Sequence, residues 1–191
     1  METEMQIALL GILGTLSGTV LGWFLNTLSQ RGKLDTYISS WKDEFMYNNI
    51  GVIKPSSSIE QTGIYNYELS LDVYNNSGEM KIMRNIKVVF SNNKNELYQS
   101  IPKDDATRRI SHQMMFYDDI SPINIPSKSV INIKFHNSLW NKNGSLDFIW
   151  NTNSVFLRYT DEKNKDKNIL IKKEIYKDYF INHKVEEQNN G

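Results

Sequence analysis

Hydrophobic and polar positions follow two different patterns in this chain. Residues 7–28 are predominantly apolar, and no charged residue occurs between Met5 and Gln30. Over residues 33–181 no second apolar run of this length occurs, and apolar positions alternate with polar ones instead. The first pattern is typical of a membrane-spanning helix, and the second is typical of strands with one buried face.

The apolar stretch has the length of a membrane span. At about 1.5 Å per residue, a helix over 7–28 reaches about 33 Å, which exceeds the roughly 30 Å thickness of a hydrocarbon core. The stretch contains no proline, and Thr15, Ser17 and Thr19 can return their hydroxyls to backbone carbonyls. Trp23 lies toward its C-terminal end, where aromatic side chains anchor helices at the interface. We therefore predict a transmembrane helix.

Three other interpretations of this stretch fit the sequence less well. A cleavable secretory signal needs a basic leader and a small-residue cleavage site, whereas residues 1–4 contain Glu2 and Glu4 and no A-x-A site follows. A lipoprotein signal needs a cysteine, and the chain has none. A helix buried in a soluble core remains an alternative, although four glycines would weaken it in water.

Charges at the two ends of the stretch predict its orientation. Glu2 and Glu4 precede it, whereas Arg31, Lys33 and Lys42 follow it. The positive-inside rule places the basic side in the cytoplasm and gives acidic residues little weight. We therefore expect a single-pass protein of the cell membrane with a cytoplasmic C-terminal domain, and Arg31 and Lys33 as the charges that set this topology.

Glycines recur along one face of the predicted helix. Gly14, Gly18 and Gly22 follow one another at intervals of four residues, with Gly11 one turn earlier. Such a face lets two backbones approach closely in lipid, although glycine is also common in membrane helices in general. These four glycines are the predicted packing face of a homo-oligomer.

Alternation with a period of two predicts a series of strands after the helix. In 65–74, Tyr65, Tyr67, Leu69, Leu71 and Val73 share one face. The turn-forming sequence Asn-Asn-Ser-Gly follows at 75–78, and 161–168 is a charged segment expected to form an exposed hairpin loop. The other predicted strands cover residues 34–45, 81–90, 108–117, 130–135, 155–159 and 169–175, of which 34–45 and 108–117 have the weaker patterns.

Seven or eight short strands joined by polar turns predict an all-β fold, an Ig-like antiparallel β-sandwich preceded by a single N-terminal transmembrane α-helix. No G-x-G-x-x-G or phosphate-binding loop argues for a parallel α/β fold. The predicted organisation is a short N-terminal segment (1–6), the membrane helix (7–28), a juxtamembrane segment with the first strand (29–62), the sandwich (63–181) and a disordered tail (182–191).

Three segments resemble immunoglobulin-like sandwiches. Residues 65–74 followed by Asn-x-Ser-Gly and by 82–90 are similar to the early strands, 125–133 is similar to the later proline loop and strand, and 156–161 is similar to a closing hairpin. The resemblance extends over 63–175 and lacks the cysteine pair and tryptophan spacing of antibody domains. The whole arrangement resembles uncharacterised small bacterial or phage membrane-anchored proteins with one N-terminal helix and an Ig-like domain. Abundant Asn, Lys and Ile with only two Ala suggest the same source.

Composition excludes several classes of function. With 22 basic and 22 acidic residues the formal net charge is zero, so we expect no nucleic-acid partner. The lack of cysteine excludes disulfides, thiolate metal sites and a cysteine nucleophile. His112, His136 and His183 have no metal-ligand spacing, and we expect them to be scattered surface residues. We expect no catalytic residues, no cofactor and no metal, and therefore no enzyme.

A few remaining groups allow a second interpretation. The acidic pairs at 104–105, 118–119 and 161–162 suit either turns or a calcium site. The lysines of 161–168 alternate with acidic residues, so a solvated loop is favoured over a lipid contact. Residues 114–117 and Trp140 are large side chains between polar loops, for which core packing is favoured over an exposed recognition patch.

These observations predict a membrane-tethered binding or scaffolding module, with the lipid bilayer and an unknown protein as partners. Two alternatives are a phage- or prophage-encoded defence or exclusion protein at the membrane, which genomic neighbours would reveal, and a cell-surface carbohydrate- or calcium-binding domain. The second alternative requires the domain to lie outside the cell.

The glycine face provides a first test. Replacing Gly18 with Ile puts a branched side chain between the two helices and should reduce the yield of chemically crosslinked dimer, while the circular dichroism of the domain stays the same. Unchanged crosslinking would contradict a role of this face in self-association.

Overall fold

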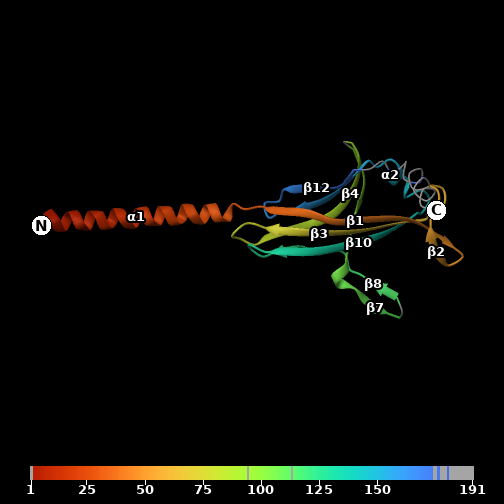
Figure 1. Ribbon diagram of the computed structural model, residues 1–191, viewed down its shortest axis with the longest axis horizontal. Coiled ribbons are helices and arrows are strands. Elements are labelled where there is room, and N and C mark those ends of the chain that lie inside the picture. The colour runs from red at the N-terminus through yellow and green to blue at the C-terminus, as the bar shows by residue number, and fades with distance from the viewer. Residues whose placement is uncertain (1, 94, 113, 174–175, 177–179, 181–191) are drawn as a thin grey trace, which may run out of the picture.

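The computed structural model describes residues 2–173 except 94 and 113, together with residues 176 and 180. An N-terminal helix extends away from a two-layered β domain along the long axis of the molecule (Figure 1). The elements, in chain order, are α1 (Glu2–Gln30), β1 (Leu34–Asn49), β2 (Val52–Pro55), β3 (Ile64–Asn75), β4 (Lys81–Asn92), β5 (Asn95–Ser100), β6 (Lys103–Asp104), the 3-10 turn η1 (Asp105–Thr107), β7 (Arg109–Ser111), β8 (Met114–Phe116), β9 (Ile123–Ile125), β10 (Val130–Trp140), α2 (Asp147–Trp150), β11 (Ser154–Thr160) and β12 (Asp166–Lys173).

Helix α1 stands clear of the domain over its apolar length. By length and composition, 5–30 is long and apolar enough to cross a membrane, and none of its most apolar window is buried by the rest of the chain. The Thr15 hydroxyl donates to the Gly11 carbonyl (2.5 Å), and the Thr19 hydroxyl donates to the Thr15 carbonyl (2.8 Å), as predicted. The helix thus satisfies these polar groups itself and turns apolar side chains outward.

Two antiparallel sheets form the domain. The first has the strand order β2-β1-β3-β10-β6, and the second has the order β12-β11-β4-β5 with β9 paired to the start of β4. This arrangement confirms the predicted all-β, Ig-like sandwich class. Strands predicted over 65–74, 81–90, 130–135 and 155–159 are all present and slightly longer than expected. The strand predicted over 169–175 begins earlier, at Asp166, and its last two residues lie outside the described part of the chain, as does the tail at 182–191.

The core lies between the inward faces of the two sheets. The alternating face of β3 is completely covered, with Tyr65, Leu71 and Val73 at 0–1% exposure. Strand β4 faces it with Met83, Val88 and Phe90. Each buried side chain of this size contributes about 1.5–3 kcal/mol by leaving water, so the period-two pattern of β3 fixes which way that strand faces.

One buried carboxylate joins both sheets at the end of the core that lies away from α1. Asp43 on β1 accepts hydrogen bonds from the hydroxyls of Tyr176 (2.5 Å) and Tyr65 (3.2 Å) and from Lys172 Nζ (3.2 Å) on β12. Burial raises the pKa of Tyr65, and Tyr176 and Asp43 beside it raise the pKa further, so its hydroxyl stays a donor. These contacts tie β1, which lies between β2 and β3 in the first sheet, to the second sheet as well.

Candidate interaction surfaces

The junction between α1 and the domain is short and hydrogen-bonded. Three residues, 31–33, separate the end of α1 from the start of β1. The Gly78 N–H in the turn between β3 and β4 donates to the carbonyl of Ser29 in the last turn of α1 (2.8 Å). Lys33 and Asn76 bind each other, since Lys33 N–H donates to Asn76 Oδ1 (2.7 Å) and Asn76 N–H donates to the Lys33 carbonyl (3.2 Å). The helix is thus attached to the domain by its end as well as by the chain.

Two glycines allow this close approach. A Cβ at Gly32 would overlap the side chain of Asn76 and the backbone of Ser77, and a Cβ at Gly78 would lie 2.7 Å from the Ser29 hydroxyl. A side chain at Gly32 therefore requires the helix end to move away from the turn, whereas one at Gly78 requires at least that the Ser29 side chain turn away. The Asn-x-Ser-Gly sequence, predicted only as a turn, is the docking point of α1.

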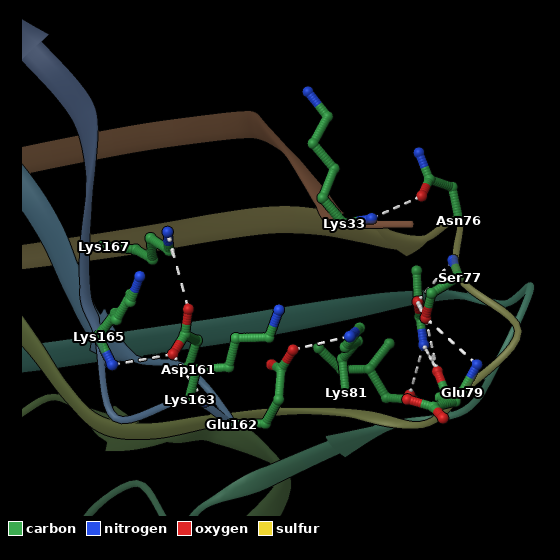
Figure 2. A network of polar contacts seen from close by, with 12 residues as sticks. Lys33, Asn76, Ser77, Glu79, Lys81, Asp161, Glu162, Lys163, Lys165 and Lys167 are labelled. Carbon is green, nitrogen blue, oxygen red and sulfur yellow. Dashed lines mark hydrogen bonds and ion pairs between the residues drawn. The ribbon is translucent and has the colours of Figure 1, made fainter. Parts of the chain in front are cut away.

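A buried asparagine holds this turn in shape. The side-chain nitrogen of Asn75 donates to the carbonyls of Glu79 (2.7 Å) and Ile125 (3.0 Å), and its oxygen accepts from the hydroxyl of Ser77 (2.6 Å). Figure 2 shows Lys33, Asn76 and Ser77 next to each other at this end of the domain. Asn75 is fully buried, and its bonds to Ile125 and Ser77 are shielded from water.

The loop between β11 and β12 lies at the same end of the domain and is built around Asp161. Its carboxylate accepts from the backbone N–H groups of Lys163 and Lys165 (both 2.9 Å) and lies 3.7 Å from Lys167 Nζ. Burial raises the pKa of Asp161, but these hydrogen bonds and the Lys167 charge outweigh it and hold the pKa below its ordinary value. Asp161 is buried, which corrects the expectation that the whole loop is exposed.

The second acidic residue of this loop is also paired within the protein. Glu162 accepts from the Nζ of Lys81, at 2.7 Å, and the Lys81 side chain is only 8% exposed. Burial raises the pKa of Glu162, but the Lys81 bond lowers it and the net direction is down. Both carboxylates of the loop are therefore occupied, whereas the side chains of Lys163 and Lys165 are exposed and have no hydrogen bond or ion pair within the described residues (Figure 2).

A hollow of about 410 Å³ lies between this loop and the junction. Its walls come from 30–34 at the end of α1 and the start of β1, from Lys81 and Tyr159, and from 161–163, Lys165 and Lys167. The hollow begins where the apolar side chains of α1 stop. We call it the junction hollow.

A two-stranded hairpin projects from the opposite half of the domain. Strands β7 and β8 pair only with each other and extend away from the first sheet (Figure 1). Ile110 is 67% exposed, and Met114 and Met115 are each 59% exposed. Core packing, which we expected for 114–117, is therefore wrong for Met114, Met115 and Phe116, and also for Trp140, which is 53% exposed. The single strand expected over 108–117 is instead this hairpin, which reverses at His112 with φ +48°.

Polar contacts fix the base of the hairpin. Arg109 donates to both oxygens of Asp118 (2.7 Å each), and Asp119 accepts from Lys103 Nζ (2.6 Å). His136 Nδ1 bonds to Asp105, and the rings of Tyr117 and His136 pack edge to face with their centroids 4.2 Å apart. Hence polar contacts attach the base of the hairpin to the domain, while Ile110, Met114 and Met115 nearer its tip are exposed.

An apolar groove runs beside the hairpin along strand β10. Strand β10 pairs with β6 only at Phe135 and His136, so on that side 130–134 has no strand partner in the described residues. A groove of about 470 Å³ follows this open edge and is lined by four isoleucines, Ile120, Ile123, Ile131 and Ile133, together with 104–106, Asn132 and Lys134. An open edge with an apolar wall is the geometry to which extended peptides bind.

A second apolar tip lies at the far end of β1. Ile50 is 99% exposed at the reversal between β1 and β2, with φ +52°, a conformation that branched side chains rarely adopt. Val52 and Ile53 beside it are at least half exposed. A side chain this exposed buries no surface in the core, so core packing does not account for the strained conformation of Ile50.

The structure separates the other residues that the sequence singled out. A Cβ added at any glycine of the predicted packing face would meet no atom within 4 Å; these are Gly11, Gly14, Gly18 and Gly22. No other described part of this chain therefore covers that face. Arg31 and Lys33 lie at the junction, as expected from their place in the sequence. In the acidic pairs, the Asp104 N–H donates to the Asp118 carbonyl (3.0 Å), so 104–105 and 118–119 lie side by side, whereas 161–162 lies at the junction. Their carboxylates bond other groups, since Asp104 caps η1, and Asp105, Asp118, Asp119 and Glu162 contact basic side chains. Among the described residues no group of three or more His, Asp or Glu could hold a metal ion.

Comparison with known proteins identifies a family. The model of the YopI Ig-like domain matches residues 32–172. A relative described as an SPbeta prophage-derived uncharacterized protein YopI from Bacillus subtilis strain 168 is 29% identical over 167 residues, which is 84% of this chain and 92% of the relative.

Solved structures show only distant likeness. An uncharacterized β-sandwich protein from Clostridium difficile 630 is 14% identical and covers 73% of this chain and 86% of its own, with a TM-score of 0.32. A flagellar-like filament protein, Iho670, is 10% identical and covers 92% of this chain and 100% of its own, with a TM-score of 0.34.

The close packing at the junction yields a second test. Gly32→Ala places a Cβ against Asn76 and Ser77 and should lower the free energy of unfolding by about 1–3 kcal/mol, the usual cost of overpacking. Gly63→Ala is the matched control, because a Cβ there meets only ordinary contacts. Chemical denaturation of the full chain in mild detergent measures both, and equal stability of the two variants would contradict a tightly packed junction.

Proposed function

This chain belongs to the YopI Ig-like domain family, and we propose that it is a membrane-tethered binding module. Helix α1 spans the bilayer, the junction holds the sandwich upright on the surface, and the β7–β8 hairpin with its neighbouring groove binds a protein partner. The observation that carries the proposal is the exposed apolar surface of the β7–β8 hairpin on a domain whose core is otherwise well covered.

The apolar helix supports the tether. Its 26 residues from Met5 to Gln30 reach about 39 Å at 1.5 Å per residue, enough to span a bilayer. Side chains such as Leu9, Leu16 and Phe24 remain at least half exposed, and only lipid or another helix would relieve that cost. The hydrogen bond from Gly78 to Ser29 favours a permanent anchor over a cleaved signal, because cleavage would remove a partner of the domain.

The position of the binding surfaces fits a tether. Strand β1 has 16 residues, which is a length of about 50 Å at 3.3 Å per residue, and it starts at the junction. The Ile50 tip then lies at the far end of the domain, and the β7–β8 hairpin projects sideways between the two ends (Figure 1). Exposed apolar groups at such positions are accessible to a protein partner and out of reach of the bilayer that holds the helix.

The cytoplasm is the proposed side for the domain. Arg31, Lys33 and Lys42 follow the span closely along the chain, whereas Glu2 and Glu4 precede it. The positive-inside rule counts basic residues at such positions and places them in the cytoplasm.

Sidedness is tested with single cysteines, since the chain has none of its own. Lys142→Cys, on an exposed loop far from α1, should resist a membrane-impermeant thiol reagent in intact cells and react after permeabilisation. Thr3→Cys, at the opposite end of the span, should show the reverse. Labelling of residue 142 in intact cells would place the domain outside.

Binding through the hairpin is tested by site-specific crosslinking. A photoreactive residue in place of Met115 should give a discrete crosslinked product in native membranes, and Ile110→Thr with Met114→Thr should greatly reduce it. Such surface changes alter stability by about 0.5 kcal/mol or less. The control variant carries Tyr37→Thr and Leu170→Thr, which remove exposed side chains of similar size from β1 and β12. An equal loss of product in both variants, or no product at all, would contradict the proposal.

The prophage origin of the Bacillus subtilis relative supports a second candidate, defence or exclusion at the membrane. In that case cells that make this protein should resist infection by competing phage, and the hairpin variant should restore plaque formation while the control variant does not. Equal plating on all strains would remove this candidate and leave the binding module in place.

A further inference from the structure

We propose that the junction hollow binds the phosphate headgroup of an anionic phospholipid. This inference rests on the proposed tether, because the hollow reaches headgroup depth only if α1 spans the bilayer. Headgroup binding goes beyond anchoring, because an apolar helix alone does not distinguish one lipid from another.

The residues that line the hollow carry a net positive charge, although acidic and basic residues alternate along the 161–168 loop. Six basic residues line it against two acidic ones. Glu162 is paired with the buried Lys81, and Asp161 is occupied by two backbone N–H groups and Lys167. The basic residues that remain available are Arg31, Lys33, Lys163 and Lys165.

These four basic residues are accessible. Lys33 has a side chain 79% exposed and only one weak ion pair, 3.4 Å from Asp35. Asp35 is itself shared with the side-chain nitrogen of Asn76 at 3.0 Å. The side chains of Arg31, Lys163 and Lys165 have no polar partner within the described residues, and all three are exposed. A phosphodiester would find several donors, with Asp35 as a weak competitor for Lys33 and the lining carboxylates Asp161 and Glu162 already bonded to other groups.

The position of the hollow matches a headgroup. The last large apolar residue of α1 is Leu28, and the hollow begins two residues later at Gln30. Because the junction is hydrogen-bonded, the 161–167 loop is held beside the helix end. Arginine binds phosphate through two parallel hydrogen bonds and lysine binds it as a point charge, so the lining suits this ligand.

The site is tested by counting lipids bound to the full chain. Protein in uncharged detergent at low ionic strength is titrated with phosphatidylglycerol or phosphatidylcholine, and adducts are measured by native mass spectrometry. Phosphatidylglycerol should bind preferentially. Lys163→Gln with Lys165→Gln should weaken it about tenfold to thirtyfold, because each lysine near anionic lipid contributes about 1 kcal/mol.

Controls separate this site from general charge effects and from the tether itself. Lys54→Gln with Lys142→Gln removes two exposed lysines at the far end of the domain and should leave lipid binding unchanged. Equal loss in both variants, equal binding of both lipids, or displacement of the lipid by inorganic phosphate would overturn the headgroup site. Flotation of the wild-type chain with uncharged vesicles reports on the tether alone, so failure there is distinguishable from failure here.

Discussion

The close contact between the end of α1 and the turn after β3 determines how the two halves of this protein relate. The Gly78 N–H bonds the Ser29 carbonyl at the helix end, and Asn76 bonds Lys33 just before β1. Gly32 packs so closely against the turn that no side chain would fit at this position. A longer linker would let the domain move freely relative to α1. With this contact in place, the strands continue nearly along the helix axis (Figure 1).

This constraint gives each end of the domain a separate role. The end beside α1 carries the junction hollow, whose exposed lysines would lie at the level of lipid headgroups if α1 spans the bilayer as proposed. The other parts of the surface carry the apolar tips of the β7–β8 hairpin and of Ile50. In the proposed function, polar contacts to the bilayer and apolar contacts to a partner would thereby be kept apart.

Much of the fold could be predicted from the sequence, and the candidate surfaces could not. Alternation in β3 is a local signal, because burial of every second residue is imposed on a strand with one covered face. Judged by the sequence, Asp161 and Glu162 neutralise the lysines next to them. In the structure Glu162 pairs with Lys81 instead, and the sequence could not indicate this because the two residues are 81 positions apart. For 114–117 the sequence favours core packing, because large side chains favour burial in general and nothing local marks an exposed tip. One signal was available for the junction, the Asn-x-Ser-Gly turn, but its contact with Ser29 depends on the fold.

The most direct test of this account measures the height of each end of the domain above a bilayer. Met80 and Ile53 are exposed residues at the near and far ends, and Met80→Cys and Ile53→Cys each provide a single site for a fluorophore in the full chain. In vesicles that contain headgroup spin-labelled lipid, we predict strong quenching at residue 80 and little at residue 53. Similar quenching at both positions would show that the domain is not held upright, and the absence of quenching at both, in protein that does not float with the vesicles, would show that α1 is not a membrane anchor.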